Sequence, residues 1–194
     1  MVVNERTLPS WARDPRVRVG AVVAVAVLVA LGVWLVVRNN DNGGNSGAVA
    51  TGPSIGPVAA SEDRLRQLAG QEGHDIYWVG PEANTTYELT RTSAGRIFVR
   101  YLPKGVPVGV DKADYTIVGT YPVPNATNVL QGLAEKSGEN KLSVPNGGIA
   151  VYSSSQPTNV YVAYPGSNLQ IEVFDPSAER AQRLVTSGQV EPVS

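Results

Sequence analysis

The chain has 194 residues, a net charge of −1 and only 17% charged residues, which predicts one ordinary domain with accessory segments. This charge balance gives no electrostatic basis for nucleic acid binding, so no nucleic acid partner is predicted. The absence of cysteine excludes disulfides, zinc–thiolate sites, a cysteine nucleophile and a lipid-modified cysteine anchor.

The first feature along the chain is the uncharged apolar run at residues 19–37. A helix of that length spans about 28 Å, close to the roughly 30 Å of a bilayer's hydrocarbon core. Four arginines precede the run, whereas only Arg38 follows it before Arg64. The positive-inside rule therefore predicts a cytoplasmic tail at residues 1–18, a single transmembrane helix that contacts the lipid bilayer at residues 19–37, and a remainder outside the cytoplasm.

A cleaved signal peptide is the competing interpretation, because residues 48–50 read Ala-Val-Ala, as cleavage sites often do. The apolar run is longer than the core of a typical signal peptide, and ten residues separate it from that sequence. An uncleaved anchor is therefore favoured. Under both interpretations the C-terminal domain is exported.

Residues 38–60 are predicted to be a flexible linker. The stretch is rich in Gly and Asn, contains two prolines and lacks aromatic residues, so it offers little with which to build a core. A coil of this length has an end-to-end distance of roughly 25 Å. The linker would hold the following domain near the membrane surface while leaving it free to reorient.

The folded domain is predicted over residues 61–194, and it begins with a helix. Ser61 suits an N-cap, acidic residues follow in the first turn, Leu65 starts an apolar stripe, and Gly70 or Gly73 ends the helix. Two further helices are predicted, at residues 125–138 with Asn125 as the N-cap and at residues 175–188 with Asp175 as the N-cap.

Between the helices lie segments rich in β-branched and aromatic residues, which predict strands. They are residues 75–79, 87–92, 96–102, 115–121, 149–153, 160–164 and 169–174. The second and third of these are predicted to form a tight hairpin across residues 93–95. This order predicts an α+β fold with a mostly antiparallel sheet of about seven strands and helices packed on one face. Each half has three strands and then a helix closed by Ser-Gly, which either a weak internal duplication or the general similarity of hairpins explains.

A family resemblance is carried by residues 73–105 (GHDIYWVGPEANTTYELTRTSAGRIFVRYLPKG) and residues 160–177 (VYVAYPGSNLQIEVFDPS). These segments resemble an uncharacterised family of membrane-anchored extracytoplasmic proteins from actinobacteria and related high-GC bacteria. The resemblance extends over residues 61–190. It implies an anchored domain at the cell membrane, and it supplies no site residues.

Few residues suggest catalysis or metal binding. His74 is the only histidine, whereas zinc and iron sites usually combine several such ligands. A triad with partners distant in sequence stays open, although no G-x-S-x-G sequence supports it. Asp111 and Asp114 lack the dense spacing of a calcium loop, which favours solvated loop charges. No glycine-rich phosphate loop is present either, so no cofactor is predicted.

One face of the predicted sheet suggests a protein interface. Because side chains alternate along a strand, Arg96, Phe98 and Arg100 share one face, and Tyr161 is expected on the same side. Aromatic residues and arginine are enriched in interfaces, so these four residues form a candidate partner face for an acidic envelope protein. The alternatives are a solvated face with cross-strand pairs, or a face covered by a helix or by the loop at residues 103–113.

The anchor, the linker and the lack of a catalytic pattern favour a non-catalytic binding domain of the bacterial cell envelope. The predicted location is the cell membrane, with the N-terminus in the cytoplasm and the domain outside. The alternative is an envelope hydrolase or transferase that uses dispersed Ser, Asp or Glu residues. A structural spacer between membrane and wall is a third interpretation.

Overall fold

The structure, a computed structural model, describes residues 53–193. The predicted cytoplasmic tail, the predicted transmembrane helix and most of the predicted linker lie outside the described residues. Within residues 53–193, no helix combines the length and the hydropathy needed to cross a bilayer.

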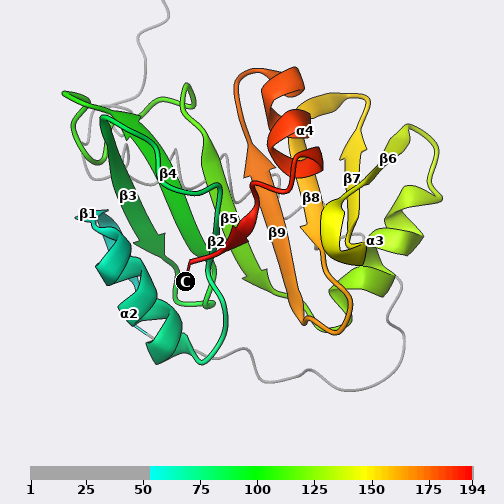
Figure 1. Ribbon diagram of the computed structural model, residues 1–194, viewed down its shortest axis with the longest axis horizontal. Helices are drawn as coiled ribbons and strands as arrows, with labels where there is room; N and C mark the ends of the chain where they lie inside the picture. Colours follow the sequence, from blue (N-terminus) through cyan, green and yellow to red (C-terminus); the bar gives the residue numbers. More distant parts are fainter. Residues whose placement is uncertain (1–52, 194) are drawn as a thin grey trace, which may run out of the picture. The chain divides into compact units, whose positions relative to one another are not determined.

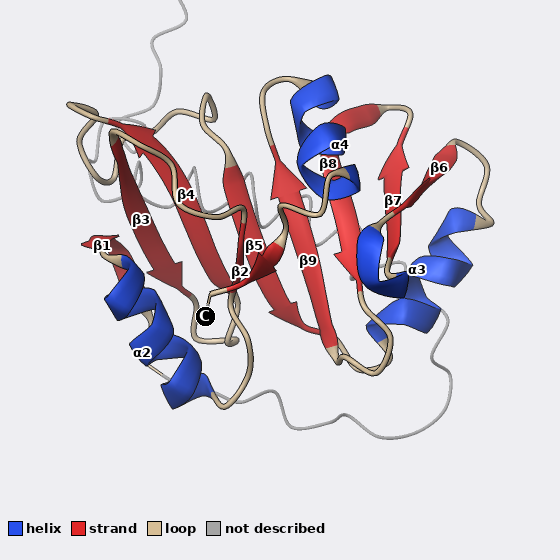
Figure 2. Cartoon of the chain, viewed as in Figure 1, coloured by secondary structure: helices blue, strands red, loops and turns tan. Residues whose placement is uncertain are grey.

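The described residues form an antiparallel sheet of eight strands with three α-helices (Figure 1, Figure 2). The strands in spatial order are β1 (Ile55–Ala60), β3 (Thr85–Arg91), β4 (Ile97–Pro103), β5 (Ile117–Pro122), β9 (Leu169–Phe174), β8 (Gln156–Ala163), β7 (Ile149–Ser153) and β6 (Glu139–Ser143). The helices are α2 (Glu62–Glu72), α3 (Ala126–Ala134) and α4 (Ala178–Thr186), with a short 3-10 helix, η2, at Pro145–Gly147. Beside the sheet, β2 (Tyr77–Trp78) pairs with β10 (Glu191–Pro192). The prediction of an α+β fold with a large antiparallel sheet is confirmed.

Local sequence signals account for the β3–β4 hairpin. Its turn is closed by hydrogen bonds between Thr92 and Arg96 and from the Gly95 N–H to the Thr92 carbonyl. Gly95 has φ 72°, a left-handed conformation that side chains other than glycine rarely adopt. The predicted tight hairpin is therefore confirmed, with a regular register from Arg91 opposite Ile97 to Thr85 opposite Pro103.

The predicted linker extended to Ala60, but Ile55–Ala60 forms β1 and pairs with β3, so the linker prediction was wrong for these residues. Glycine and proline made the segment resemble a coil. Pro57 is tolerated because β1 is an edge strand and its register is irregular between Ile55 and Val58. The domain therefore begins before Ser61.

The helix ends follow the predicted capping chemistry in part. Ser61 caps α2 by accepting a hydrogen bond from the Arg64 N–H, and Gly73 ends the helix with φ 69°. In α4 the N-cap is Ser177 rather than the predicted Asp175. Asn125 precedes α3 with φ 55° and makes no side-chain capping bond, so its predicted capping role was wrong.

The main core lies between one face of the sheet and helices α2 and α4; in Figure 1, α4 crosses in front of β8. The helices contribute Leu65, Leu68, Ala181, Leu184 and Val185, and the strands contribute Leu89, Ile97, Val99, Val118, Val160, Val162, Ile171 and Val173, among others. All of these side chains are buried. Removing apolar surface from water is the dominant favourable term in folding, so this layer supplies most of the domain's stability.

Helix α3 packs on the other face, which corrects the prediction that all helices share one face. Its buried side chains, among them Leu130, do not join the main core. The helix contacts β7 and β8, where Val151 and Ala163 lie on the face opposite the main core and are fully buried. These two strands carry apolar side chains on both faces, so both faces need cover.

The likeness of the two halves extends to the strands only. The meanders β3–β4–β5 and β7–β8–β9 meet where β5 pairs with β9, and their spatial order is mirrored about that pair. The helices that follow them, α3 and α4, lie on opposite faces. A duplicated unit related by a two-fold axis through that pair would place them on the same face.

Candidate functional site

Three residues of the candidate partner face, Phe98, Arg100 and Tyr161, lie on one side of the sheet. Arg96 is half-buried just before β4, with its guanidinium carbon 6.0 Å from the centroid of the Tyr121 ring. The register places Phe98 opposite Gly119, Gly119 opposite Glu172 and Glu172 opposite Tyr161. However, Phe98, Arg100 and Tyr161 are only 7%, 4% and 6% exposed. The expectation of an open surface at these three positions was therefore wrong. Phe98 packs edge to face against Tyr121, with ring centroids 5.7 Å apart, and Arg100 and Tyr161 take part in polar groups within the chain.

Arg100 is engaged by a buried ion pair and by the loop that follows β4. Its guanidinium Nη1 lies 3.1 Å from Glu88 Oε1 and donates to the Val110 carbonyl at 2.9 Å. Glu88 Oε2 accepts from the Gly109 N–H at 2.6 Å, and the guanidinium stacks over the Tyr115 ring at 5.1 Å. The alternative in which this loop folds over the face therefore holds at Arg100.

A second polar group, the Glu172 cluster, consists of Glu172, Tyr121, Asn159 and Tyr161. Glu172 accepts hydrogen bonds from the Tyr121 hydroxyl, from Asn159 Nδ2 at 2.6 Å and from the Tyr161 hydroxyl at 3.4 Å. Gly119 makes room for this arrangement, because a Cβ there would lie 2.6 Å from the Tyr121 hydroxyl oxygen. The cluster thus ties β5, β8 and β9 together through one carboxyl group.

Burial at this cluster shifts the pKa of its carboxyl group and of its two phenols. Burial raises the pKa of Glu172 above its ordinary value, and the hydrogen bonds from Tyr121, Asn159 and Tyr161 offset only part of that rise. Burial and the neighbouring carboxylate also raise the pKa of both tyrosines. Folding therefore increases the proton affinity of the Glu172 carboxyl group.

Replacing Glu172 with glutamine is expected to make stability less dependent on pH. Because the folded-state pKa is raised, the folded protein holds the proton more tightly than the unfolded chain does. The tighter binding of this proton stabilises the folded state. That stabilisation is fully present below the ordinary Glu pKa of about 4.3, and it is lost as the pH rises through the folded-state pKa of Glu172. The variant's stability relative to the native chain should therefore increase as the pH rises above about 4.3 in urea titrations. Glu179→Gln, at an exposed position, is the control, and a difference that does not change with pH would contradict the assignment.

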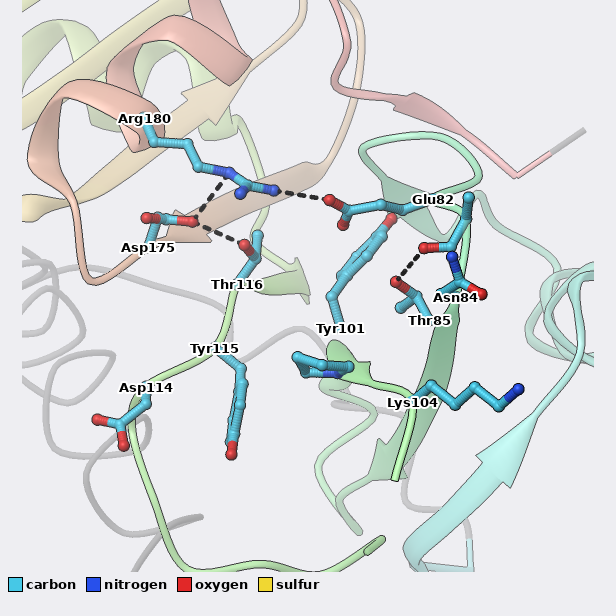
Figure 3. A pocket seen from close by; sticks show the side chains of 12 residues that line it. Glu82, Asn84, Thr85, Tyr101, Lys104, Asp114, Tyr115, Thr116, Asp175 and Arg180 are labelled. Carbon is cyan, nitrogen blue, oxygen red and sulfur yellow. Dashed lines mark hydrogen bonds and ion pairs between the residues drawn. The ribbon is translucent and has the colours of Figure 1, made fainter. Parts of the chain in front are cut away.

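On the surface, a pocket of about 520 Å³ opens where β3 starts, β4 ends and α4 begins (Figure 3). We call it the Arg180 pocket. It is lined by Glu82, Ala83, Asn84, Thr85, Tyr101, Pro103, Lys104, Asp114, Tyr115, Thr116, Asp175 and Arg180. Its volume falls within the roughly 300–1,000 Å³ range of small-molecule sites.

Arg180 connects the two sides of this pocket. Its guanidinium lies 3.3 Å from Asp175 Oδ2 and 3.1 Å from Glu82 Oε1. The buried Asp175 also accepts from the Thr116 hydroxyl at 2.7 Å and from the Ser177 N–H at 2.8 Å, which turns the chain into α4. Arg180 thus forms ion pairs with carboxylates on both sides of the pocket, Asp175 and Glu82.

Tyr101 belongs to the same pocket and is held by the backbone. Its hydroxyl accepts from the Val79 N–H at 2.9 Å and donates to the Gly80 carbonyl at 3.1 Å. Burial raises the pKa of Tyr101, which keeps the phenol protonated. Both hydrogen-bonding roles are therefore used within the chain, and Tyr101 contributes mainly its ring to the pocket.

The predicted chemical residues are not assembled into a site. His74 is not among the lining residues, and its Nδ1 lies 2.8 Å from the carbonyl oxygen of the adjacent Asp75. Asp114 lines the Arg180 pocket and is exposed, whereas Asp111 is not a lining residue. Across residues 53–193, no group of three or more His, Asp or Glu side chains is placed to hold a metal ion.

Sequence reasoning missed the Arg180 pocket because its residues come from separate segments. Asp114 had been considered only for calcium binding and Asp175 only as a helix cap. Arg180 lies in the first turn of α4 and Tyr101 lies within β4, and the others lie at the end of a strand or in a loop, where polar residues are common. Comparison of the chain with protein-family models, with curated proteins and with solved structures found no match, so its function has to be argued from the chemistry of its own residues.

Proposed function

We propose that the protein is a membrane-anchored, extracytoplasmic binding domain of the bacterial cell envelope with no catalytic role. The observation that carries the proposal is the Arg180 pocket. Its arginine is held by two carboxylates, so the pocket presents hydrogen-bonding groups in fixed positions. Such preorganised polar groups in a concave site favour recognition of a ligand, because little ordering remains to be done on binding.

The location rests on sequence. The uncharged run at residues 19–37 is long enough to cross a bilayer, and the arginines before it favour an N-terminus in the cytoplasm. The described domain would then lie outside the cell membrane, where envelope proteins and wall polymers are its available partners.

A topology experiment tests the location. A C-terminal alkaline phosphatase fusion, which is active only outside the cytoplasm, is expected to be active, and the matching β-galactosidase fusion inactive. N-terminal sequencing of the mature protein should begin before residue 19. Cytoplasmic activity would refute the orientation, and a mature N-terminus near residue 51 would refute the anchor.

An envelope hydrolase or transferase is the second candidate, and the Glu172 cluster is the observation that favours it. A buried carboxyl group with a raised pKa is a common feature of general acids. Against this role, the described neighbours of Glu172 all act as donors to it, and the cluster contains no side chain arranged as a nucleophile beside a base. If purified full-length protein hydrolysed isolated cell-wall material, and Glu172→Gln abolished that activity, the binding proposal would fail.

A further inference from the structure

The Arg180 pocket contains charges of both signs that largely cancel. Its lining includes three carboxylates, Glu82, Asp114 and Asp175, and two cations, Lys104 and Arg180. Arg180 is paired with two of the carboxylates, and the buried Asp175 is further satisfied by hydrogen bonds from Thr116 and Ser177. An ionic ligand would have to displace these pairs to find an opposite charge, which would leave a buried or half-buried charge without its partner.

The remaining charged side chains do not change this balance. Lys104 and Asp114 are both exposed, and in Figure 3 the Lys104 side chain extends away from the group formed by Arg180, Asp175 and Glu82. Exposed charges are weakened by solvent and salt, and this also holds for Glu82, whose side chain is 44% exposed. The pairing of Arg180 with the buried Asp175 is therefore what disfavours an ionic ligand. The pocket is therefore suited to a ligand without net charge.

The pocket's polar groups are suited to hydroxyl groups. Paired carboxylates keep lone pairs that can accept further hydrogen bonds, and the amide of Asn84 both donates and accepts. A hydroxyl group also donates and accepts, so a ligand with several hydroxyls can bind such groups without disturbing the ion pairs. Arg180, with part of its guanidinium exposed, supplies further N–H donors.

Aromatic surface completes the pocket. Tyr115 lines it from the segment before β5, and Tyr101 lines it from β4 (Figure 3). The Arg100 guanidinium over the Tyr115 ring, at 5.1 Å, fixes that ring in place. A half-exposed tyrosine offers a flat apolar face beside polar groups, which suits the apolar C–H face of a sugar ring.

We propose that the Arg180 pocket binds a neutral saccharide, with the Tyr115 ring against a sugar face and Glu82, Asn84 and Arg180 bonded to its hydroxyls. The inference rests on the proposed binding function and names its ligand class. A volume of about 520 Å³ is large enough for more than one sugar ring. An exported domain would meet such a ligand in the glycans of the envelope.

Calorimetric titration of the full-length protein in detergent micelles tests the proposal. The probes are three neutral trisaccharides (maltotriose, cellotriose and triacetylchitotriose), with inorganic phosphate as the anionic probe and spermidine as the cationic probe. At least one trisaccharide is expected to bind, with an affinity that changes less than about twofold when salt is raised tenfold, because screening acts on charge pairs. Binding of phosphate or spermidine alone, or of none of the five probes, would overturn the proposal.

Single substitutions test whether a trisaccharide binds in the Arg180 pocket or elsewhere on the surface. Tyr115→Ala should weaken trisaccharide binding at least tenfold, whereas Tyr115→Phe should preserve it, since the ring supplies the contact. Tyr152→Ala, at a half-buried position outside the pocket, should leave binding unchanged. Equal loss in Tyr115→Ala and Tyr152→Ala would refute the site. The titration tests the ligand class, whereas the reporter fusions test the location. If no trisaccharide binds but the fusions still place the domain outside the cytoplasm, the proposed ligand class is refuted and the proposed location stands.

Discussion

Replacing Arg91 with alanine is expected to lower the free energy of unfolding by about 3–5 kcal/mol, because it leaves a carboxylate without its partner in a buried site. Arg91 and Glu72 form a two-point pair, with Nε to Oε1 at 2.7 Å and Nη2 to Oε2 at 2.8 Å. Their side chains are 6% and 13% exposed. The pair joins the end of α2 to β3, and the hydrogen bond from Glu72 raises the pKa of Arg91.

Two control variants show whether the loss of unfolding free energy in Arg91→Ala comes from breaking the buried ion pair. Arg183→Ala removes an exposed pair with Glu179 on α4 and should change stability by only about 0.3–0.5 kcal/mol. The double variant Arg91→Met with Glu72→Leu should recover much of the loss, since apolar side chains of similar volume often replace a buried pair without cost. Urea denaturation provides the measurement. A loss below about 1 kcal/mol for Arg91→Ala would show that water reaches the pair.

Replacing Ile171 with alanine is expected to destabilise the domain by about 2–5 kcal/mol. Ile171 lies in β9, opposite Thr120 on one side and Val162 on the other, and its side chain is fully buried in the main core. The loss combines the transfer of buried methyl and methylene groups with the cavity left where helix and sheet meet.

The matched control is Val58→Ala on the edge strand β1, where the side chain is 42% exposed. It should change stability by less than about 0.5 kcal/mol. Unfolding can be followed by Trp78 fluorescence after Trp11→Phe and Trp34→Phe, which leave a single tryptophan. Similar losses for Ile171→Ala and Val58→Ala would contradict the position assigned to the core.

Local features of the fold were predictable from sequence because their causes are local. The cap at Ser61, the stop at Gly73 and the hairpin turn at Gly95 each depend on a few adjacent residues. Two edge strands were missed for the opposite reason. The segment that forms β1 contains Gly and Pro, and β6 reads ENKLS, so only pairing with β3 and β7 makes them strands.

The candidate partner face shows how far alternation along a strand can be used. It placed Phe98, Arg100 and Tyr161 on one face, but it carried no information on which neighbours would bury them. Glu88 lies opposite Arg100 in the β3–β4 hairpin and Glu172 lies opposite Tyr161 in the β8–β9 hairpin, so these contacts follow chain order. The pairing of β5 with β9, which brings Tyr121 to Glu172, and the loop that covers Arg100 are the parts that strand alternation could not indicate. The Arg180 pocket depends on the same long-range arrangement, which is why no single motif indicated it.

The place where β1 enters the sheet has a mechanical consequence. Tension applied through the preceding chain would reach the described domain at Pro53, whose carbonyl accepts a hydrogen bond from Arg91 Nη1 at 2.9 Å. The first residue pair between β1 and β3 is Ile55 with Arg91. The Arg91 guanidinium therefore connects the N-terminal end of β1 to β3 and, through Glu72, to α2. A pulling force would therefore have to break the hydrogen bonds of Arg91 to Pro53 and Glu72 before it could separate β1 from β3. Without these bonds, the hydrogen bonds between β1 and β3 would break one after another.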